Sequence, residues 1–111
     1  MATFITRGRF SQSGVQGLLA KPEDREEAVK RLVEAAGGKL VHYFVTTGDT
    51  DFLLMAEGDE TEMAVASAMA AAASGAVSDL TTSQAWTSAE FKAVTEKASA
   101  IVGSYKAPGE G

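Results

Sequence analysis

His42 is the only histidine in the chain, and histidine is the side chain that most readily exchanges a proton near neutral pH. Its chemistry makes it the candidate general base of a catalytic site, or a polar contact to a bound ligand. The alternative is a partly buried strand residue that hydrogen-bonds to a neighbour. Because no second histidine accompanies His42, the sequence favours the structural role.

Arg7 and Arg9 are separated by one residue in a stretch rich in β-branched and aromatic side chains. Residues two apart in a strand point to the same face of a sheet, so the two guanidinium groups should lie together. Each one either pairs with a carboxylate, such as that of Asp51 or Asp79, or binds an anionic ligand through two parallel hydrogen bonds. The sequence favours pairing, and Arg7 is the candidate ligand contact.

Asp49 and Asp51 lie in a turn that begins with Gly48, where their oxygens could approach a cation. Calcium needs six or more oxygen ligands, and the chain lacks the twelve-residue loop pattern that supplies them, so no metal is predicted. Aspartates in turns more often accept hydrogen bonds from nearby backbone amides. Asp51 is also a candidate ligand-binding residue, because its carboxylate could stabilise charge beside the catalytic or ligand contacts.

Tyr43 and Trp86 are candidates to line a pocket for a flat organic ligand, since aromatic side chains combine a large contact area with a polar tip. The alternative, which the sequence favours, is packing in the core or at a subunit interface. No cofactor is predicted, because the glycine-containing stretch 11–17 lacks the glycine and lysine spacing of a phosphate-binding loop.

The amino-acid composition excludes several classes of partner and of chemistry. The 111 residues are 45% apolar and 23% charged, which is ordinary for a globular chain. A formal charge of −5 opposes binding to nucleic acid or to an anionic membrane. The absence of cysteine excludes disulfides and thiolate chemistry, and the N-terminus lacks the pattern of a signal peptide. A cytoplasmic location is therefore predicted.

The elements that must position these residues alternate between strands and helices. Their order predicts an α+β fold, the ferredoxin-like βαββαβ arrangement with one appended C-terminal helix. A single domain is expected over residues 1–103, with a flexible tail at 104–111. The expected elements are a strand at 3–10, a helix at 22–36 that holds Pro22 in its first turn, strands at 40–47 and 51–57, a helix from an Asp59 cap to Gly75, a strand at 77–86, and a helix opened by the capping box Thr87–Glu90.

Both faces of the two central strands carry apolar residues. Helices should cover one face, so the other would be exposed in a monomer and is expected to pack against a second subunit. The predicted partner is therefore another copy of the chain, in a homodimer or a higher homo-oligomer. Alternation divides the side chains into two sets in each strand: Leu40, His42 and Phe44 against Val41, Tyr43 and Val45, and Phe52, Leu54 and Ala56 against Leu53 and Met55.

The chain resembles the GYD domain family of small bacterial proteins, which belongs with the dimeric α/β barrels. The resemblance rests on the segment from Gly37 to Phe52, the preceding helix that contains Arg25, and the passage from Thr81 to Phe91. It implies a dimeric α/β barrel assembly and no particular activity.

The family signature runs glycine, any residue, tyrosine, aspartate. Gly48, Asp49 and Asp51 occupy the first, second and last of these places, whereas Thr50 replaces the tyrosine. If the tyrosine ring normally stacks on a ligand or on a partner subunit, this contact is lost or altered here.

Three functions remain open. The leading hypothesis is an oligomeric protein that binds a small aromatic or anionic metabolite, with Arg7, His42, Tyr43, Asp51 and Trp86 as the candidate contacts. A second is a cofactor-independent isomerase or monooxygenase in which His42 acts as base and Asp51 or Arg7 stabilises charge. A third is a purely structural, self-assembling protein. No substrate can be identified from the sequence.

Overall fold

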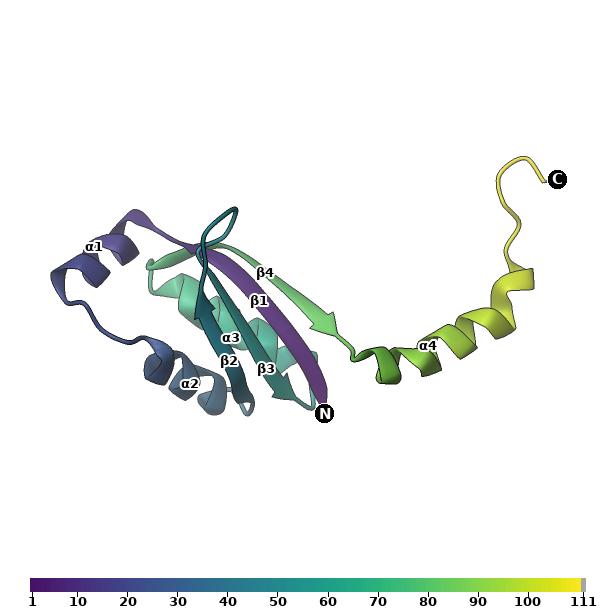
Figure 1. Ribbon diagram of the computed structural model, residues 1–111, viewed down its shortest axis with the longest axis horizontal. Coiled ribbons are helices and arrows are strands. Elements are labelled where there is room, and N and C mark those ends of the chain that lie inside the picture. Colours follow the sequence, from purple (N-terminus) through teal and green to yellow (C-terminus); the bar gives the residue numbers. More distant parts are fainter. Residues whose placement is uncertain (111) are drawn as a thin grey trace.

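The computed structural model describes residues 1–110, which form a four-stranded sheet flanked by helices (Figure 1). The sheet has the strand order β2-β3-β1-β4, and each neighbouring pair is antiparallel. The elements are β1 (Ala2–Phe10), α1 (Gln12–Ala20), α2 (Glu26–Ala35), β2 (Lys39–Val45), β3 (Phe52–Gly58), α3 (Thr61–Ala73), β4 (Val77–Ala85), α4 (Ser88–Ile101) and the short 3-10 helix η1 (Val102–Ser104).

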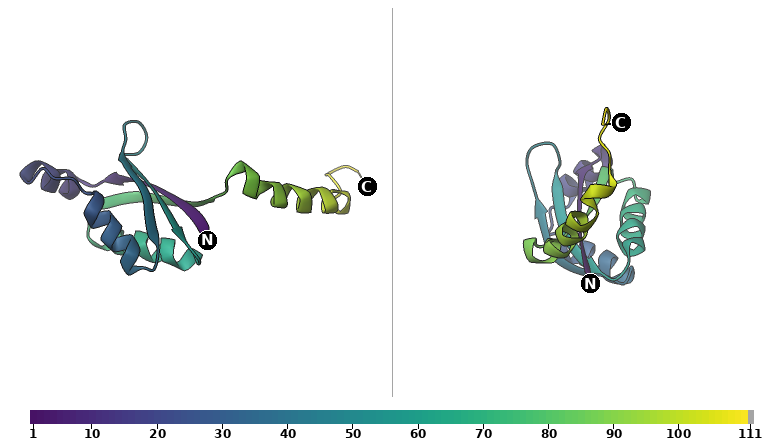
Figure 2. Two further views of the ribbon diagram at one scale, coloured as in Figure 1. Left: turned by 60° about the horizontal axis from the view of Figure 1, so that its bottom comes forward. Right: turned by 90° about the vertical axis from the view of Figure 1, so that its right-hand side faces the viewer.

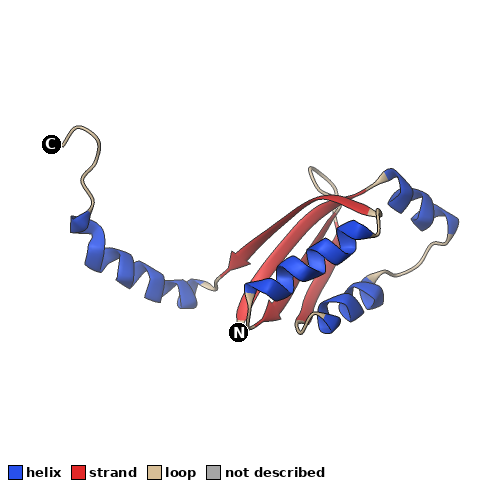
Figure 3. Ribbon diagram, turned by 180° about the vertical axis from the view of Figure 1, so that it is seen from behind, coloured by secondary structure: helices blue, strands red, loops and turns tan. Residues whose placement is uncertain are grey.

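The architecture is the α+β, ferredoxin-like fold with an extra C-terminal helix that the element order predicted. Helices α2 and α3 lie side by side on one face of the sheet (Figure 3), and no element of residues 1–110 covers the opposite face, which is turned to the viewer in Figure 1. We call these the helical face and the open face. Of the helices in residues 1–110, none is long and apolar enough to cross a membrane.

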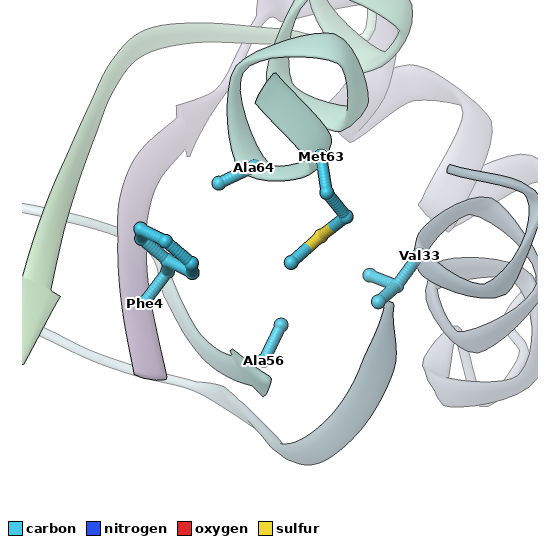
Figure 4. Packing of buried hydrophobic residues seen from close by; sticks show 5 residues of the cluster. All are labelled: Phe4, Val33, Ala56, Met63 and Ala64. Carbon is cyan, nitrogen blue, oxygen red and sulfur yellow. The ribbon is translucent and has the colours of Figure 1, made fainter. Parts of the chain in front are cut away.

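The hydrophobic core lies between the helical face and the two helices that cover it (Figure 4). Met63 is packed so closely there that a Cβ atom on Gly58 would lie 2.5 Å from its Cε, and one on Gly38 2.6 Å from its Sδ. Both glycines therefore allow α3 to approach the ends of β2 and β3. The five residues of the cluster are Phe4, Val33, Ala56, Met63 and Ala64.

The sequence prediction missed α1. Its stretch reads as a turn because it contains serines and glycines, yet Ser11 caps the helix by accepting a hydrogen bond from the Gly14 amide at 3.1 Å. Gly14 in turn lies against the loop before β4, where an added Cβ would meet the Ala76 carbonyl oxygen at 2.1 Å. Pro22 belongs to the linker after α1, and α2 begins only at Glu26.

The apolar spacing of α3 predicts a buried face made of Met63, Ala66, Met69, Ala70 and Ala73, and for most of this face the prediction is wrong. Met63 is buried as predicted, but Met69 is 68% exposed and Ala66 is exposed too, while Ala64 is buried. The helix is so rich in alanine that its apolar residues define no single stripe, and contact with the sheet decides which side is buried. Its N-cap is Glu60, which makes no side-chain capping bond, so the predicted Asp59 cap is absent.

Two helices project from the sheet at opposite ends of the molecule (Figure 2). Helix α1 extends beyond one end, and α4 leads away from the other. The radius of gyration is 18.0 Å, whereas a compact chain of this length has a radius of about 13 Å. The capping box that opens α4 is confirmed, with Thr87 and Glu90 bonded in both directions.

Candidate functional site

A bulge in β2 changes the faces predicted for that strand. Leu40 pairs with Ala56, but the next paired residue, His42, faces Met55, so Val41 is the extra residue. Directly opposed residues point to the same face. Leu40 therefore packs on the helical face against the core, and the expected set of Leu40 with His42 and Phe44 is wrong.

His42 lies on the open face and is exposed. Its ring stacks on Phe44, with ring centroids 5.7 Å apart and planes inclined by 20°. The neighbouring strands contribute Ile5 and Met55 in the same row as His42. The surroundings of the histidine are therefore an apolar sheet surface with an adjacent row that contains Arg7.

Arg7 and Arg9 share the open face, as their spacing predicted, and both are exposed. Arg9 donates a hydrogen bond from Nε to the Asp49 carbonyl oxygen at 2.9 Å. Within residues 1–110 neither arginine forms an ion pair, so the expected pairing with Asp51 or Asp79 does not occur. Arg7 is therefore a charged group without an ion pair, in the same row of the open face as Leu53 and Phe44.

Asp51 holds the β2–β3 hairpin against the end of β1. One carboxylate oxygen accepts a hydrogen bond from the Phe10 amide at 2.9 Å, and the Asp51 amide donates to the Gly8 carbonyl at 2.8 Å. In the same turn, Thr46 donates from Oγ1 to the carbonyl of Thr50 at 2.9 Å. The carboxylate thus has a backbone partner, and no cluster in residues 1–110 combines three or more metal-ligating side chains.

A cleft of about 520 Å³ opens between the helical face and the three helices α1, α2 and α3. Its floor is a row of aromatic rings that crosses three strands, from Phe10 on β1 through Phe52 on β3 to Tyr43 on β2. The ring centroids of Phe10 and Phe52 are 5.4 Å apart, and those of Tyr43 and Phe52 are 6.3 Å apart. The walls include Leu18, Leu32, Ala68 and Ala71.

Gly8 makes this floor possible. Its position in β1 lies beneath the side chains of neighbouring strands, where a Cβ would meet Leu80 Cδ2 at 2.5 Å and Phe52 Cζ at 2.7 Å. Without a side chain at Gly8, these two apolar groups lie across the strand and extend the floor toward Leu80.

Most polar groups inside the cleft already have partners. Thr6 and Thr82 share a hydrogen bond of 2.9 Å between their hydroxyls, and Ser67 donates to the Met63 carbonyl at 2.9 Å. Near the mouth, Arg25 forms an ion pair of 2.7 Å with Glu23. Lys21 also lines the cleft, is exposed to solvent and forms no ion pair within residues 1–110. The cleft therefore combines a mostly apolar surface with one unpaired positive charge.

Among the hydroxyl groups of the lining, Tyr43 is the exception. Among residues 1–110 its hydroxyl has no hydrogen-bond partner within the protein, although the side chain is half-buried. Burial raises the pKa of Tyr43, while the nearby charge of Arg25 lowers it and that of Asp24 raises it. The hydroxyl therefore stays protonated over the ordinary pH range and can donate one hydrogen bond into the cleft.

The five predicted site residues do not form one site. Arg7 and His42 share the open face, Tyr43 lies in the cleft on the other side of the sheet, and Asp51 closes a hairpin. Trp86 follows the end of β4 and packs edge-on against Phe91 of α4, with centroids 5.7 Å apart.

Sequence reasoning overlooked most of the cleft. Phe10 follows Arg9 in its strand and therefore points away from the two arginines, and Phe52 shares the alternating set of Leu54 and Ala56; both were usable signals for the aromatic floor. The contribution of Leu18 had no such signal, because the sequence predicts no helix between the strand at 3–10 and the helix at 22–36.

The fold and the cleft define a ferredoxin-like α+β protein with a ligand-sized cavity between sheet and helices. The chain belongs to the GYD domain family, whose sequence model matches residues 4–95. No curated protein and no solved structure matches the chain.

Proposed function

We propose that the protein binds a small, flat and predominantly apolar organic molecule in the cleft on the helical face. The observation that carries the proposal is the aromatic row of Phe10, Phe52 and Tyr43 beneath a cavity of about 520 Å³. Cavities of roughly 300–1,000 Å³ hold molecules of metabolite or drug size. Aromatic rings favour flat ligands, which stack or meet them edge-on.

The polar groups of the cleft support a neutral ligand more than a charged one. Arg25 is neutralised by Glu23 at the mouth, and the interior hydroxyls of Thr6 and Ser67 are already bonded. Lys21 has no ion pair in residues 1–110, but it is exposed to solvent. Burying an ion without a partner costs far more than burying a neutral group. Of the aromatic or anionic metabolite expected from the sequence, the aromatic class fits this cleft better, with Tyr43 donating one hydrogen bond to an acceptor on the ligand.

The test replaces Ala68, a half-buried wall residue of α3, with leucine to fill the cleft. N-phenyl-1-naphthylamine, a neutral aromatic probe whose fluorescence rises in apolar surroundings, reports occupancy. Ala68→Leu should weaken probe binding about tenfold or more, because a filled pocket rejects even small groups by steric overlap. Native mass spectrometry of freshly purified protein would show any small molecule already retained.

The matched control is Ala73→Leu, which adds the same side chain to an exposed position of α3 outside the cleft. This variant should bind the probe like the parent protein. Equal probe binding by the parent and both variants, with all three folded, would contradict the proposal.

The protein is further proposed to act as a homodimer, or a higher homo-oligomer, through the open face. Ile5, Leu53, Met55 and Phe44 give this face an apolar centre, and Phe44 is 56% exposed. Apolar surface of this kind on a soluble chain commonly marks an interface. A catalytic role for His42 would require a substrate on the open face, because the sheet separates this residue from the cleft.

A further inference from the structure

Helix α4 carries an apolar stripe that its own chain leaves uncovered. The stripe consists of Phe91, Val94, Ala98 and Ile101, whose spacing of three, four and three residues aligns them on one side of the helix. The three larger side chains are between 41% and 58% exposed. Trp86 covers one edge of Phe91 and is itself 47% exposed.

The connection to β4 is short and held by local contacts. Only Trp86 and Thr87 separate the two elements. Thr87 accepts a hydrogen bond from the Glu90 amide at 3.1 Å, and Glu90 accepts one from the Thr87 amide at 2.8 Å. These bonds and the Trp86–Phe91 contact set the direction of the helix, which leads away from the sheet (Figure 1).

The charges of α4 argue against a membrane as the cover. The helix contains two glutamates and two lysines, and the whole chain has a formal charge of −5. Helices that lie on anionic membranes are instead rich in lysine and arginine. Lys92 and Glu96 lie opposite the stripe, so a protein surface can cover it without burying them.

A second copy of the chain offers an apolar surface of matching character. Helix α1 contains no charged residue, and its Val15 and Leu19 are exposed at the end of the molecule opposite α4. A two-fold arrangement would cover two stripes at once, one from each copy. It would also account for a radius of gyration of 18.0 Å, because both projecting helices would then be packed.

We propose that α4 is an exchanged arm whose stripe packs on a second copy of this chain. The inference is independent of the ligand proposed for the cleft. It is also distinct from contact through the open face, which could form with both arms free.

Single cysteines test this inference cleanly, because the natural chain has none. Val94→Cys places a thiol in the stripe, and Ala93→Cys places one a residue earlier, about 100° around the helix, as the matched control. Maleimide labelling is followed over a range of protein concentrations, with the oligomeric state measured in parallel. At concentrations where the protein associates, Cys at position 94 should react about tenfold or more slowly than Cys at position 93.

If a second copy covers the stripe, the thiol of the Val94→Cys variant should lose its protection on dilution, because the copies separate. Protection that persists in the monomer would mean that the arm folds onto its own chain, and equal labelling in the associated protein would mean that the stripe is free; either result overturns the proposal.

As a second measurement, Val94→Glu with Ile101→Glu should weaken association about tenfold or more, whereas Ala93→Glu with Ala100→Glu, which adds the same charge at the same spacing, should leave it nearly unchanged.

Discussion

Tyr43 contributes both an apolar ring and a hydrogen-bond donor to the cleft. Its ring belongs to the aromatic floor, and in residues 1–110 its hydroxyl is the one in the lining that has no hydrogen-bond partner. The raised pKa follows mainly from burial, which disfavours the phenolate. The unfolded chain therefore releases this proton at a lower pH than the folded protein does. The stabilisation that results is fully present below about pH 10 and is lost as the pH rises through the folded-state pKa.

Tyr43→Phe keeps the aromatic floor but has no phenol to titrate. The free energy of unfolding should accordingly fall less at alkaline pH in this variant than in the parent protein. Chemical denaturation of the parent and the variant, at neutral pH and above pH 10, measures the difference in unfolding free energy. A ligand that accepts a hydrogen bond from Tyr43 should lose about 1 kcal/mol of binding energy in the variant. An identical alkaline profile for the two proteins would contradict the assignment.

His42 contributes little to the fold in its observed position, because it is exposed and contacts mainly the ring of Phe44. His42→Ala should change the free energy of unfolding by less than about 1 kcal/mol and should leave probe binding in the cleft unchanged. Thermal unfolding and probe titration check the two statements. A strong loss of binding with intact stability would instead restore His42 as a ligand contact.

At the scale of the element, the start of α4 depends on a reciprocal pair of hydrogen bonds. The bond that Glu90 accepts from the Thr87 backbone amide lowers the pKa of this carboxyl. A depressed folded-state pKa stabilises the helix above the ordinary pKa of glutamate, and this stabilisation is lost as the pH falls through the lower value. The group is exposed to solvent, so salt should weaken the effect.

Glu90→Gln should reduce the acid sensitivity of α4, because glutamine keeps the capping geometry but does not titrate. Circular dichroism at 222 nm between pH 6 and pH 3 follows the helix content of both proteins. Thr87→Ala, which removes the cap itself, should cost the helix about 1 kcal/mol at either pH. Parallel acid curves for the parent and Glu90→Gln would show that other carboxylates govern the transition.

At the scale of the whole molecule, the open face and the projecting helices leave much apolar surface to be covered. Met55 lies between Ile5 and His42 in one row of the open face. If this face is an interface, a charge there must be buried without a partner, which opposes association. The parent should sediment as a dimer or a larger species at micromolar concentration.

Met55→Glu should therefore shift the protein toward the monomer while the fold is kept. Ala35→Glu, on the exposed side of α2, adds the same charge away from the sheet and serves as the control. Sedimentation velocity distinguishes the two variants. A monomeric parent, or a Met55→Glu protein that associates like the parent, would place assembly elsewhere.

The part of the fold that could be predicted from sequence follows from short-range rules. Alternation in β1 correctly placed Arg7 and Arg9 on one face, and a serine or threonine followed three residues later by glutamate correctly predicted the start of α4. The same rules failed where long-range contacts decide. Ser11 to Gly14 forms a helix start because Gly75 and Ala76 supply partners and a close surface from a loop more than sixty residues away.

By itself the sequence determined most element types, the antiparallel α+β order and the apolar character of both faces of the central strands, because local periodicity and capping suffice for these properties. The family was indicated separately, by the resemblance of segments such as Gly37 to Phe52. Only the tertiary structure decided which polar residues share a site. One bulge at Val41 separates Leu40 from His42, and the sheet itself separates His42 from Tyr43 although they are adjacent in the chain. The cleft arises because side chains from seven elements meet around one cavity, and local sequence patterns do not specify how distant elements pack together.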